Sequence, residues 1–173
     1  SNYKTTVDAL PHYLDEKNIK LFTTHKIFTP AEVQARYEIA VEQYCKTIHI
    51  EALTLIDMVR KKVLPAIISY MERIATTAAA KKKVSEKLSC RTEEKLLEKL
   101  SFGADAISDR LEELQNEVKR AEKIGDMLAQ AVEYKDKVLS KMQELRQEID
   151  EIEPMVSKEF WKIPTYAEML FSV

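Results

Sequence analysis

The hydrophobic pattern of the chain is dominated by one stretch, from about Thr47 to Ala80. Apolar residues recur there every three or four positions, at Ile48, Leu53, Ile56, Val59, Val63, Ile67, Met71, Ile74 and Ala78. This spacing places them along one side of an α-helix. Five further residues widen the apolar stripe: Ile50, Leu55, Leu64, Ile68 and Tyr70. A helix that is apolar over so much of its circumference has to be covered from several sides, so we predict the central helix of a bundle.

Pro65 lies inside this stretch. A proline within a helix has no N–H to donate, and its ring clashes with the preceding turn, at a cost of roughly 3 kcal/mol. The apolar stripe nevertheless stays in phase on both sides of Pro65. This favours a kinked, continuous helix over a helix end.

A strong helix start precedes the central stretch, at Thr29-Pro30-Ala31-Glu32. The threonine hydroxyl and the glutamate carboxylate, three residues apart, can each accept from the backbone N–H of the other residue, and proline suits the first helical position. We predict one long helix, or two helices separated near Thr47, over residues 30–83. Residues 7–24 are predicted to form short helices.

The second half of the chain has heptad spacing. Seam residues fall at Leu97, Leu100, Ala104, Ile107, Leu111, Leu114, Val118 and Ala121, which predicts a helix over residues 90–123. Continuing the same frame through Gly125 would place Lys135 and Arg146 on the seam. We therefore predict a turn at Gly125 and a second helix over residues 126–153. The expected fold is all-α: an antiparallel bundle built on long helices, with a kinked central helix and a heptad-patterned helical hairpin.

The two ends of the chain carry separate expectations. The chain begins with Ser1 and Asn2 and has no initiating methionine, so residues 1–2 are interpreted as a cloning remnant. This start favours the hypothesis that the chain is a fragment of a longer protein. Residues 3–173 are predicted to form a single helical domain. The tail 160–173 is rich in aromatic residues and is expected to be docked. Its candidate docking or interface residues are Phe160, Trp161, Tyr166, Leu170 and Phe171.

The charge and hydropathy of the chain argue against nucleic acid and membranes as binding partners. The net charge of -2 gives no general attraction to nucleic acid or acidic membranes, and neither partner is expected. The basic runs Arg60–Lys62 and Lys81–Lys83 are interpreted as solvated helix faces. The longest markedly apolar run, "VLPAIISYM", is far shorter than the ~20 residues that span a bilayer. With no signal peptide before the first helix, the cytoplasm is the expected location.

The sequence contains few residues in patterns typical of catalytic, phosphate-binding or metal-binding sites. Two glycines cannot form either of the common glycine-rich phosphate loops. Cys45 and His49 share a helix face at a spacing that suits two metal ligands, but no second pair completes the shell, so packed side chains are preferred. Cys45 and Cys90 are expected to be reduced thiols. A Cys–His or Ser–His–Asp arrangement stays open, because such partners meet only in space. No catalytic, cofactor-binding or metal-binding residue is predicted.

Three stretches carry a resemblance to glutamine synthetase. "KTTVDALPHYLDEKNIKLFTTHKIFTPAEVQARYEIAVEQYCKTIHIEALTLIDMVRKKVLPA" resembles the segment that follows the catalytic domain of that family. Within it, "KIFTPAEVQARY" is similar to a short helix near the end of the smaller type I enzymes. "PTYAEMLFSV" is similar to their closing segment, with Phe171 where a tyrosine is common. The long-helix insertion points to the type III branch.

The resemblance implies a parent enzyme that joins ammonia to glutamate, with ATP and a divalent metal such as Mg as cofactors. None of its catalytic segments matches this chain, so no catalytic residue and no cofactor is transferred to it. The leading hypothesis is a non-catalytic C-terminal domain for subunit packing or assembly, whose partners are the parent catalytic domain and neighbouring subunits of a homo-oligomer. The alternatives are a free-standing coiled-coil adaptor or scaffold and, third, a helical metal or redox enzyme.

Overall fold

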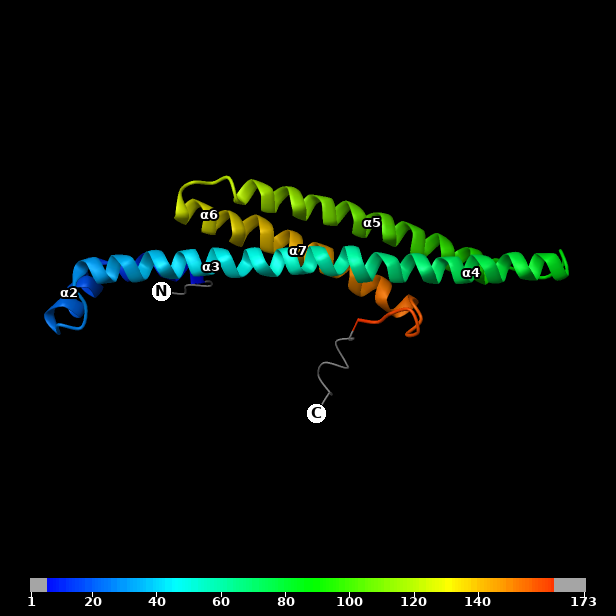
Figure 1. Cartoon of the computed structure of the whole chain (residues 1–173), viewed down its shortest axis with the longest axis horizontal. Coiled ribbons are helices and arrows are strands. Elements are labelled where there is room, and N and C mark those ends of the chain that lie inside the picture. Colours follow the sequence, from blue (N-terminus) through cyan, green and yellow to red (C-terminus); the bar gives the residue numbers. More distant parts are fainter. Residues whose placement is uncertain (1–5, 164–173) are drawn as a thin grey trace, which may run out of the picture. The chain divides into compact units, whose positions relative to one another are not determined.

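The structure is a computed structural model, and it describes residues 6–163 of the chain. Every regular element among these residues is helical, which confirms the all-α prediction (Figure 1). The α-helices are α1 (Thr6–Ala9), α2 (Glu16–Thr24), α3 (Pro30–Met58), α4 (Leu64–Val84), α5 (Arg91–Ala121), α6 (Met127–Glu133) and α7 (Leu139–Ile152). Two 3-10 helices, η1 (Leu10–Leu14) and η4 (Glu153–Met155), and two π-helices, η2 (Val59–Val63) and η3 (Tyr134–Val138), complete the set. None of the described helices combines the length and the apolar content that crossing a membrane requires.

The contacts within the chain divide it into two compact units. Among the described residues, the first unit comprises 6–53 and 115–141, and the second comprises 54–114 and 142–163. Each unit therefore contains one part of the α3–η2–α4 run and one part of the α5–α7 hairpin. The prediction of a single domain over residues 3–173 stays a prediction.

The predicted long helix is present. The α3, η2 and α4 elements follow one another without a gap as 55 helical residues, with no break near Thr47. The predicted capping interaction is confirmed: Thr29 N–H donates to Glu32 Oε2 at 2.7 Å, and Glu32 N–H donates to Thr29 Oγ1 at 3.3 Å. The hydrogen bonds from Thr29 lower the pKa of the Glu32 carboxyl.

The irregularity near Pro65 is a π-helical turn. Residues Val59–Val63 form η2, and the N–H of Leu64 donates to the carbonyl of Val59, five residues back. The turn lies directly before the proline, which occupies the first turn of α4. Val59 and Val63 are both 0% exposed. The helix thus continues through Pro65, as the apolar stripe predicts, with a π turn just before the position where the sequence analysis placed a kink.

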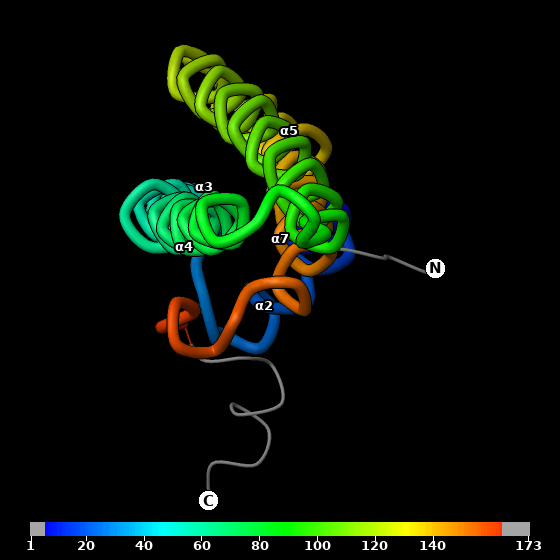
Figure 2. The backbone as a smooth tube through the Cα atoms, turned by 90° about the vertical axis from the view of Figure 1, so that its right-hand side faces the viewer, coloured from blue at the N-terminus to red at the C-terminus, as the bar shows by residue number. Residues whose placement is uncertain are grey.

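The predicted antiparallel hairpin is present in both units. In the second unit, α5 and α7 lie side by side (Figures 1 and 2), and Arg110 Nη1 lies 3.1 Å from Glu144 Oε2. In the first unit, Gln130 Nε2 donates to the carbonyl of Ala121 at 3.1 Å. Between these helices Asp126 caps α6, accepting from the N–H of Ala129 at 2.7 Å. The reversal falls where Gly125 predicts it, although Gly125 does not adopt a positive φ.

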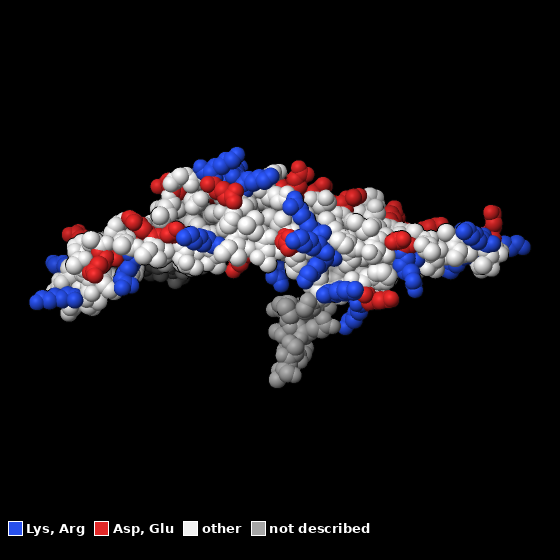
Figure 3. All heavy atoms as spheres, in the orientation of Figure 1, with Lys and Arg blue, Asp and Glu red and all other residues white. Residues whose placement is uncertain are grey.

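The core follows the predicted seams with two kinds of exception. Leu53, predicted on the buried stripe, is 46% exposed, and its neighbour Ala52 is buried in its place. Ile50 and Ile68, which widen the stripe, are 62% and 56% exposed. The expectation that this helix is covered from several sides is therefore wrong within the described residues. Charges of both signs are interspersed over the face shown in Figure 3, as the net charge of -2 suggests.

Gly103 and Gly125 provide a matched test of packing in the hairpin. A Cβ at Gly103 would overlap the buried Ile152 side chain, 2.6 Å from its Cγ1, whereas a Cβ at Gly125 would meet no atom within 4 Å. Alanine raises helix propensity by about 1 kcal/mol, but overpacking costs about 1–3 kcal/mol. We expect Gly103→Ala to lower the free energy of unfolding by about 1 kcal/mol in urea titrations, and Gly125→Ala to leave it unchanged or slightly raised. An equal response of the two variants would contradict the close approach at Ile152.

Pro65→Ala tests the π turn. Restoring a backbone donor at this position should raise the unfolding temperature. Because η2 already adjusts the hydrogen-bond ladder, the gain should be smaller than the ~3 kcal/mol of an unaccommodated helix-interior proline. Thermal unfolding followed by circular dichroism measures it. A lower unfolding temperature would instead show that the packing of Val59 and Val63 requires the turn that the proline accompanies.

Candidate functional site

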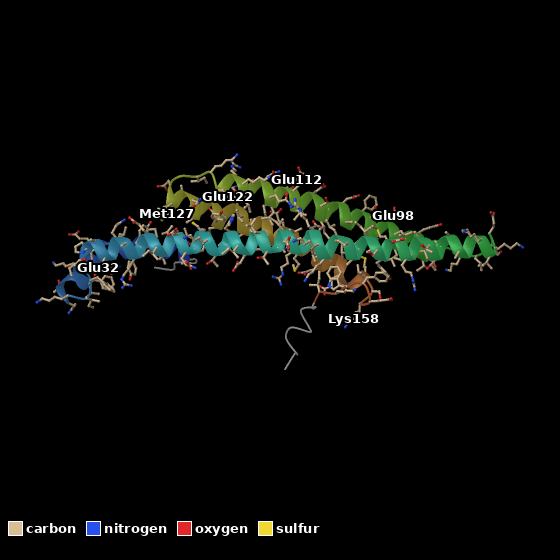
Figure 4. All side chains as sticks on the ribbon, viewed as in Figure 1. Glu32, Glu98, Glu112, Glu122, Met127 and Lys158 are labelled. Carbon is tan, nitrogen blue, oxygen red and sulfur yellow. The ribbon has the colours of Figure 1, made fainter. Side chains whose placement is uncertain are left out.

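A group of polar side chains in the first unit is the candidate functional site. His49 lies on α3 and Tyr134 begins η3. Glu122, which is labelled in Figure 4, follows the end of α5. His49 Nδ1 and Tyr134 Oη are hydrogen-bonded at 3.1 Å, and their rings meet edge to face with centroids 6.2 Å apart. His49 Nε2 lies 3.6 Å from Glu122 Oε1. We call these three residues the His49 cluster.

The local folding of the chain explains how these residues meet. On α3, Cys45, His49 and Ala52 are three or four residues apart and therefore share one side of the helix. That side is buried, because Cys45 is 5% exposed and Ala52 is 0% exposed. Tyr134 is 3% exposed at the start of the π-helix η3. A buried tyrosine needs a partner for its hydroxyl, and His49 supplies it.

The hydrogen-bonding roles in the cluster depend on the tautomer of His49. A carboxylate only accepts, so a proton on His49 Nε2 suits Glu122, and in that tautomer Nδ1 accepts from the Tyr134 hydroxyl. Burial, and secondly the charge of Glu122, raise the pKa of Tyr134 above its usual value of 10.0, which keeps this phenol a neutral donor at physiological pH.

A second polar contact connects the beginning of the chain to the same helix. Lys135 Nζ donates to Asp8 Oδ1 at 2.8 Å and lies 3.5 Å from Asp136 Oδ1. The hydrogen bond to Asp8 is the main cause of a raised pKa at Lys135. Lys135 is one of the two charged residues that the sequence analysis placed off the apolar seam. The structure shows it joining η3 to α1.

The Cys45–His49 pair differs from a metal site. Burial raises the pKa of the Cys45 thiol, so the thiol is protonated at neutral pH and is a poor ligand and nucleophile. Cys90 lies in the second unit, with Sγ 3.5 Å from the carbonyl oxygen of Ala78. Within residues 6–163, no group of three or more His, Cys, Asp or Glu side chains is placed to hold a metal ion.

The predicted docking residues fall partly inside the described region. In the second unit, the ring of Phe160 lies 5.4 Å from that of Tyr70 on α4, and Trp161 is 7% exposed. The start of the tail therefore packs on the long helix. The three other candidates, Tyr166, Leu170 and Phe171, lie outside the described residues.

The arrangement of the His49 cluster suits the joining of helices more than the transfer of protons. His49 Nδ1 faces Tyr134 Oη and His49 Nε2 faces Glu122 Oε1, so the cluster connects α3, η3 and the end of α5. Sequence reasoning identified His49 but missed Tyr134 and Glu122, because partners so distant in sequence meet only in space. The one available signal was a tyrosine at a seam position, whose hydroxyl requires a partner.

Comparison with known proteins gives the chain a context. Residues 1–82 match a family model described as the glutamine synthetase C-terminal domain. A glutamine synthetase of Butyrivibrio fibrisolvens is 36% identical over 172 residues, covering 99% of this chain and 25% of the relative. A type-3 glutamine synthetase of Dictyostelium discoideum is 29% identical, with 99% of this chain and 24% of the relative covered. A glutamine synthetase of Bacteroides fragilis (strain YCH46) is 26% identical, with 95% and 23% covered.

Two facts follow from these alignments. The chain spans about a quarter of the length of the curated relatives it matches. The family model ends inside α4 (Leu64–Val84), so the α5–α7 hairpin lies outside it, although the longer relatives align with nearly the whole chain.

Tyr134→Phe tests the cluster against Tyr44→Phe. Both phenols have a raised pKa caused mainly by burial, but within the described residues the Tyr44 hydroxyl makes no hydrogen bond. We expect Tyr134→Phe to cost about 0.5–1.5 kcal/mol of unfolding free energy at neutral pH, because the hydrogen bond to His49 is lost. Tyr44→Phe should cost less.

The stability of the same two variants should also depend on pH in different ways. A raised folded-state pKa contributes stability that is fully present below pH 10.0 and is lost as the pH rises through the folded-state value. The deficit of Tyr134→Phe relative to the natural chain should therefore shrink above pH 10.0. Urea titrations from neutral to alkaline pH measure this difference. A deficit that is constant or grows at high pH would refute the assignment of Tyr134 as a buried neutral donor.

Proposed function

The chain belongs to the family of glutamine synthetase C-terminal domains, and from this premise we propose that it is a non-catalytic helical domain that packs or assembles the subunits of such an enzyme. The observation that carries the proposal is the pair of alignments: a C-terminal domain model over residues 1–82, and relatives about four times as long that align with 95–99% of the chain. The type-3 relative supports the type III branch in particular.

The contacts between helices support a structural role. Buried or half-buried polar side chains are used to join elements: His49 with Tyr134, and Lys135 with Asp8. In the second unit, Arg110 lies 3.1 Å from Glu144 and 3.7 Å from Glu148. Interlocking contacts of this kind fix the register of packed helices, which is what a domain that positions other subunits needs.

The parent reaction is proposed to occur elsewhere in the whole enzyme. The relatives are named as glutamine synthetases, and about three quarters of their length lies outside this alignment. We place the ATP-dependent joining of ammonia to glutamate, and its divalent metal such as Mg, in that part. The proposed partners of this chain are the catalytic domain and neighbouring subunits of a homo-oligomer in the cytoplasm. The match to a glutamine synthetase family model favours this proposal over a free-standing coiled-coil scaffold.

The isolated 173-residue chain provides the first test. We expect it to be highly helical by circular dichroism, and to show no glutamate-dependent ATP hydrolysis above a blank reaction. The full-length enzyme, assayed under the same conditions, is the positive control. Glutamate-dependent hydrolysis by the isolated chain would overturn the non-catalytic assignment.

The tail provides the second arm of this test. Deleting residues 160–173 from the full-length enzyme should give a smaller particle by light scattering, with activity falling in parallel. Phe160→Ala, which removes the ring packed on Tyr70, should give part of this effect, and Lys162→Ala at an exposed position should give none. Unchanged size and rate after the deletion would exclude the tail as the assembly element and transfer that role to the helical hairpin.

A further inference from the structure

The first helix of the chain, α1, is held on the hairpin by a residue far along the sequence. Lys135 Nζ donates to Asp8 Oδ1 at 2.8 Å, across 127 positions of the chain. The two partners are half-buried, since the Lys135 side chain is 24% exposed and that of Asp8 is 36% exposed. Val7, next to Asp8, is 3% exposed. A helix of four residues therefore buries one apolar side chain and places one carboxylate on η3.

The part of the hairpin that receives α1 is the π turn that also contacts α3. Tyr134 and Lys135 are consecutive in η3, and they bond to different elements: Tyr134 to His49 on α3, and Lys135 to Asp8 on α1. Burial is the main cause of the raised pKa of Tyr44 on α3, but the charges of Lys135 and Asp8 also act on that phenol. In the first unit α1, α3 and η3 thus meet at one place.

The position of α1 depends on these tertiary contacts. Isolated helices shorter than about 12–15 residues are marginal in water, and α1 has four residues. The burial of Val7 is not directional, whereas the charged hydrogen bond between Asp8 and Lys135 fixes both distance and orientation. The α3 helix does not depend on this bond in the same way, because its own core side is buried at Val41 and Cys45.

We propose that α1 is a strap, locked by the Asp8–Lys135 ion pair, that fixes the place where the polypeptide enters this domain. The proposal rests on the proposed function for what precedes the strap: a C-terminal domain follows the rest of its enzyme along the chain, so the catalytic part precedes α1. The locked strap then connects the segment after the catalytic part to the hairpin. When it is open, the joint between the two parts is loose.

Thiol labelling of the full-length enzyme tests the lock. Val7→Cys places a thiol at the buried position of the strap, and the natural Cys45 on α3 is the internal reference for the same unit. Lys135→Met removes the charge and keeps the length of the side chain. We expect it to speed maleimide modification of Val7→Cys at least about fivefold, because a hydrogen bond between charged groups is lost. Lys137→Met, at an exposed position of the same π turn, is the control and should change neither rate.

The labelling rates, quantified on each peptide by mass spectrometry, have two outcomes that would overturn the proposal. One is an equal rate at Val7→Cys in the Lys135→Met and Lys137→Met backgrounds. The other is an equal acceleration at Cys45, which would show loosening of the whole unit instead of opening of the strap. Hydrogen exchange of residues 6–14, measured with the natural Val7, is the second readout and should rise in Lys135→Met alone.

Limited proteolysis of the full-length enzyme tests the joint. We expect Lys135→Met to release the domain, by cleavage within residues 6–14, at least about fivefold faster than Lys137→Met does. Faster labelling without faster release would overturn the role of the strap at the joint.

The isolated 173-residue chain separates this inference from the proposed function, because it contains the strap without the catalytic part. The difference in labelling between Lys135→Met and Lys137→Met should persist there. If it persists but the isolated chain hydrolyses ATP in a glutamate-dependent way, the proposed function fails and the lock stands. If Lys135→Met has no effect on labelling while tail deletion still shrinks the full-length particle, the strap fails and the proposed function stands.

Discussion

Burial of one side of the helical run from Pro30 to Val84 is the constraint on which the rest of the structure depends. An isolated helix is only marginally stable in water, and in a protein most of its stability comes from packing an apolar face. Both units contain buried residues of this helical run. In the first unit Val33 and Val41 are at most 1% exposed, and in the second unit Val59, Val63 and Ile67 are 0% exposed. Every other described element packs in a unit that contains part of this helix.

The two π turns correct the drift of an apolar seam around the surface of a long helix. A straight α-helix has 3.6 residues per turn, so a seam of fixed spacing drifts around its surface. A π turn inserts an extra residue and resets the register. Residues Val59–Val63 do this next to Pro65, where the regular ladder is already interrupted. Residues Tyr134–Val138 do it without a proline, and the turn begins at the residue that bonds to His49.

The sequence predicted what local rules determine. The capping pair Thr29 and Glu32, the turn at Gly125 and the seams of the hairpin depend on residues close in sequence, and the structure has all of them. The partners of His49 could not be predicted from the sequence. Tyr134 and Glu122 lie on other elements, and no local pattern brings them together with His49. The error at Leu53 has a related cause. A spacing of three or four residues fits both Ala52 and Leu53, and only the packing partners decide which is buried.

The chain contains a part that the family model matches and a hairpin beyond it, and specific contacts join the two. The family model covers α1, α2, α3 and most of α4, which include the capped helix start and His49. The hairpin outside that match supplies Tyr134 and Lys135, whose contacts reach back to His49 and Asp8 within the matched region. Both contacts are polar and directional, so they fix register in a way that interchangeable apolar seam residues do not. The hairpin is thus joined to the matched region by specific hydrogen bonds to His49 on α3 and to Asp8 on α1.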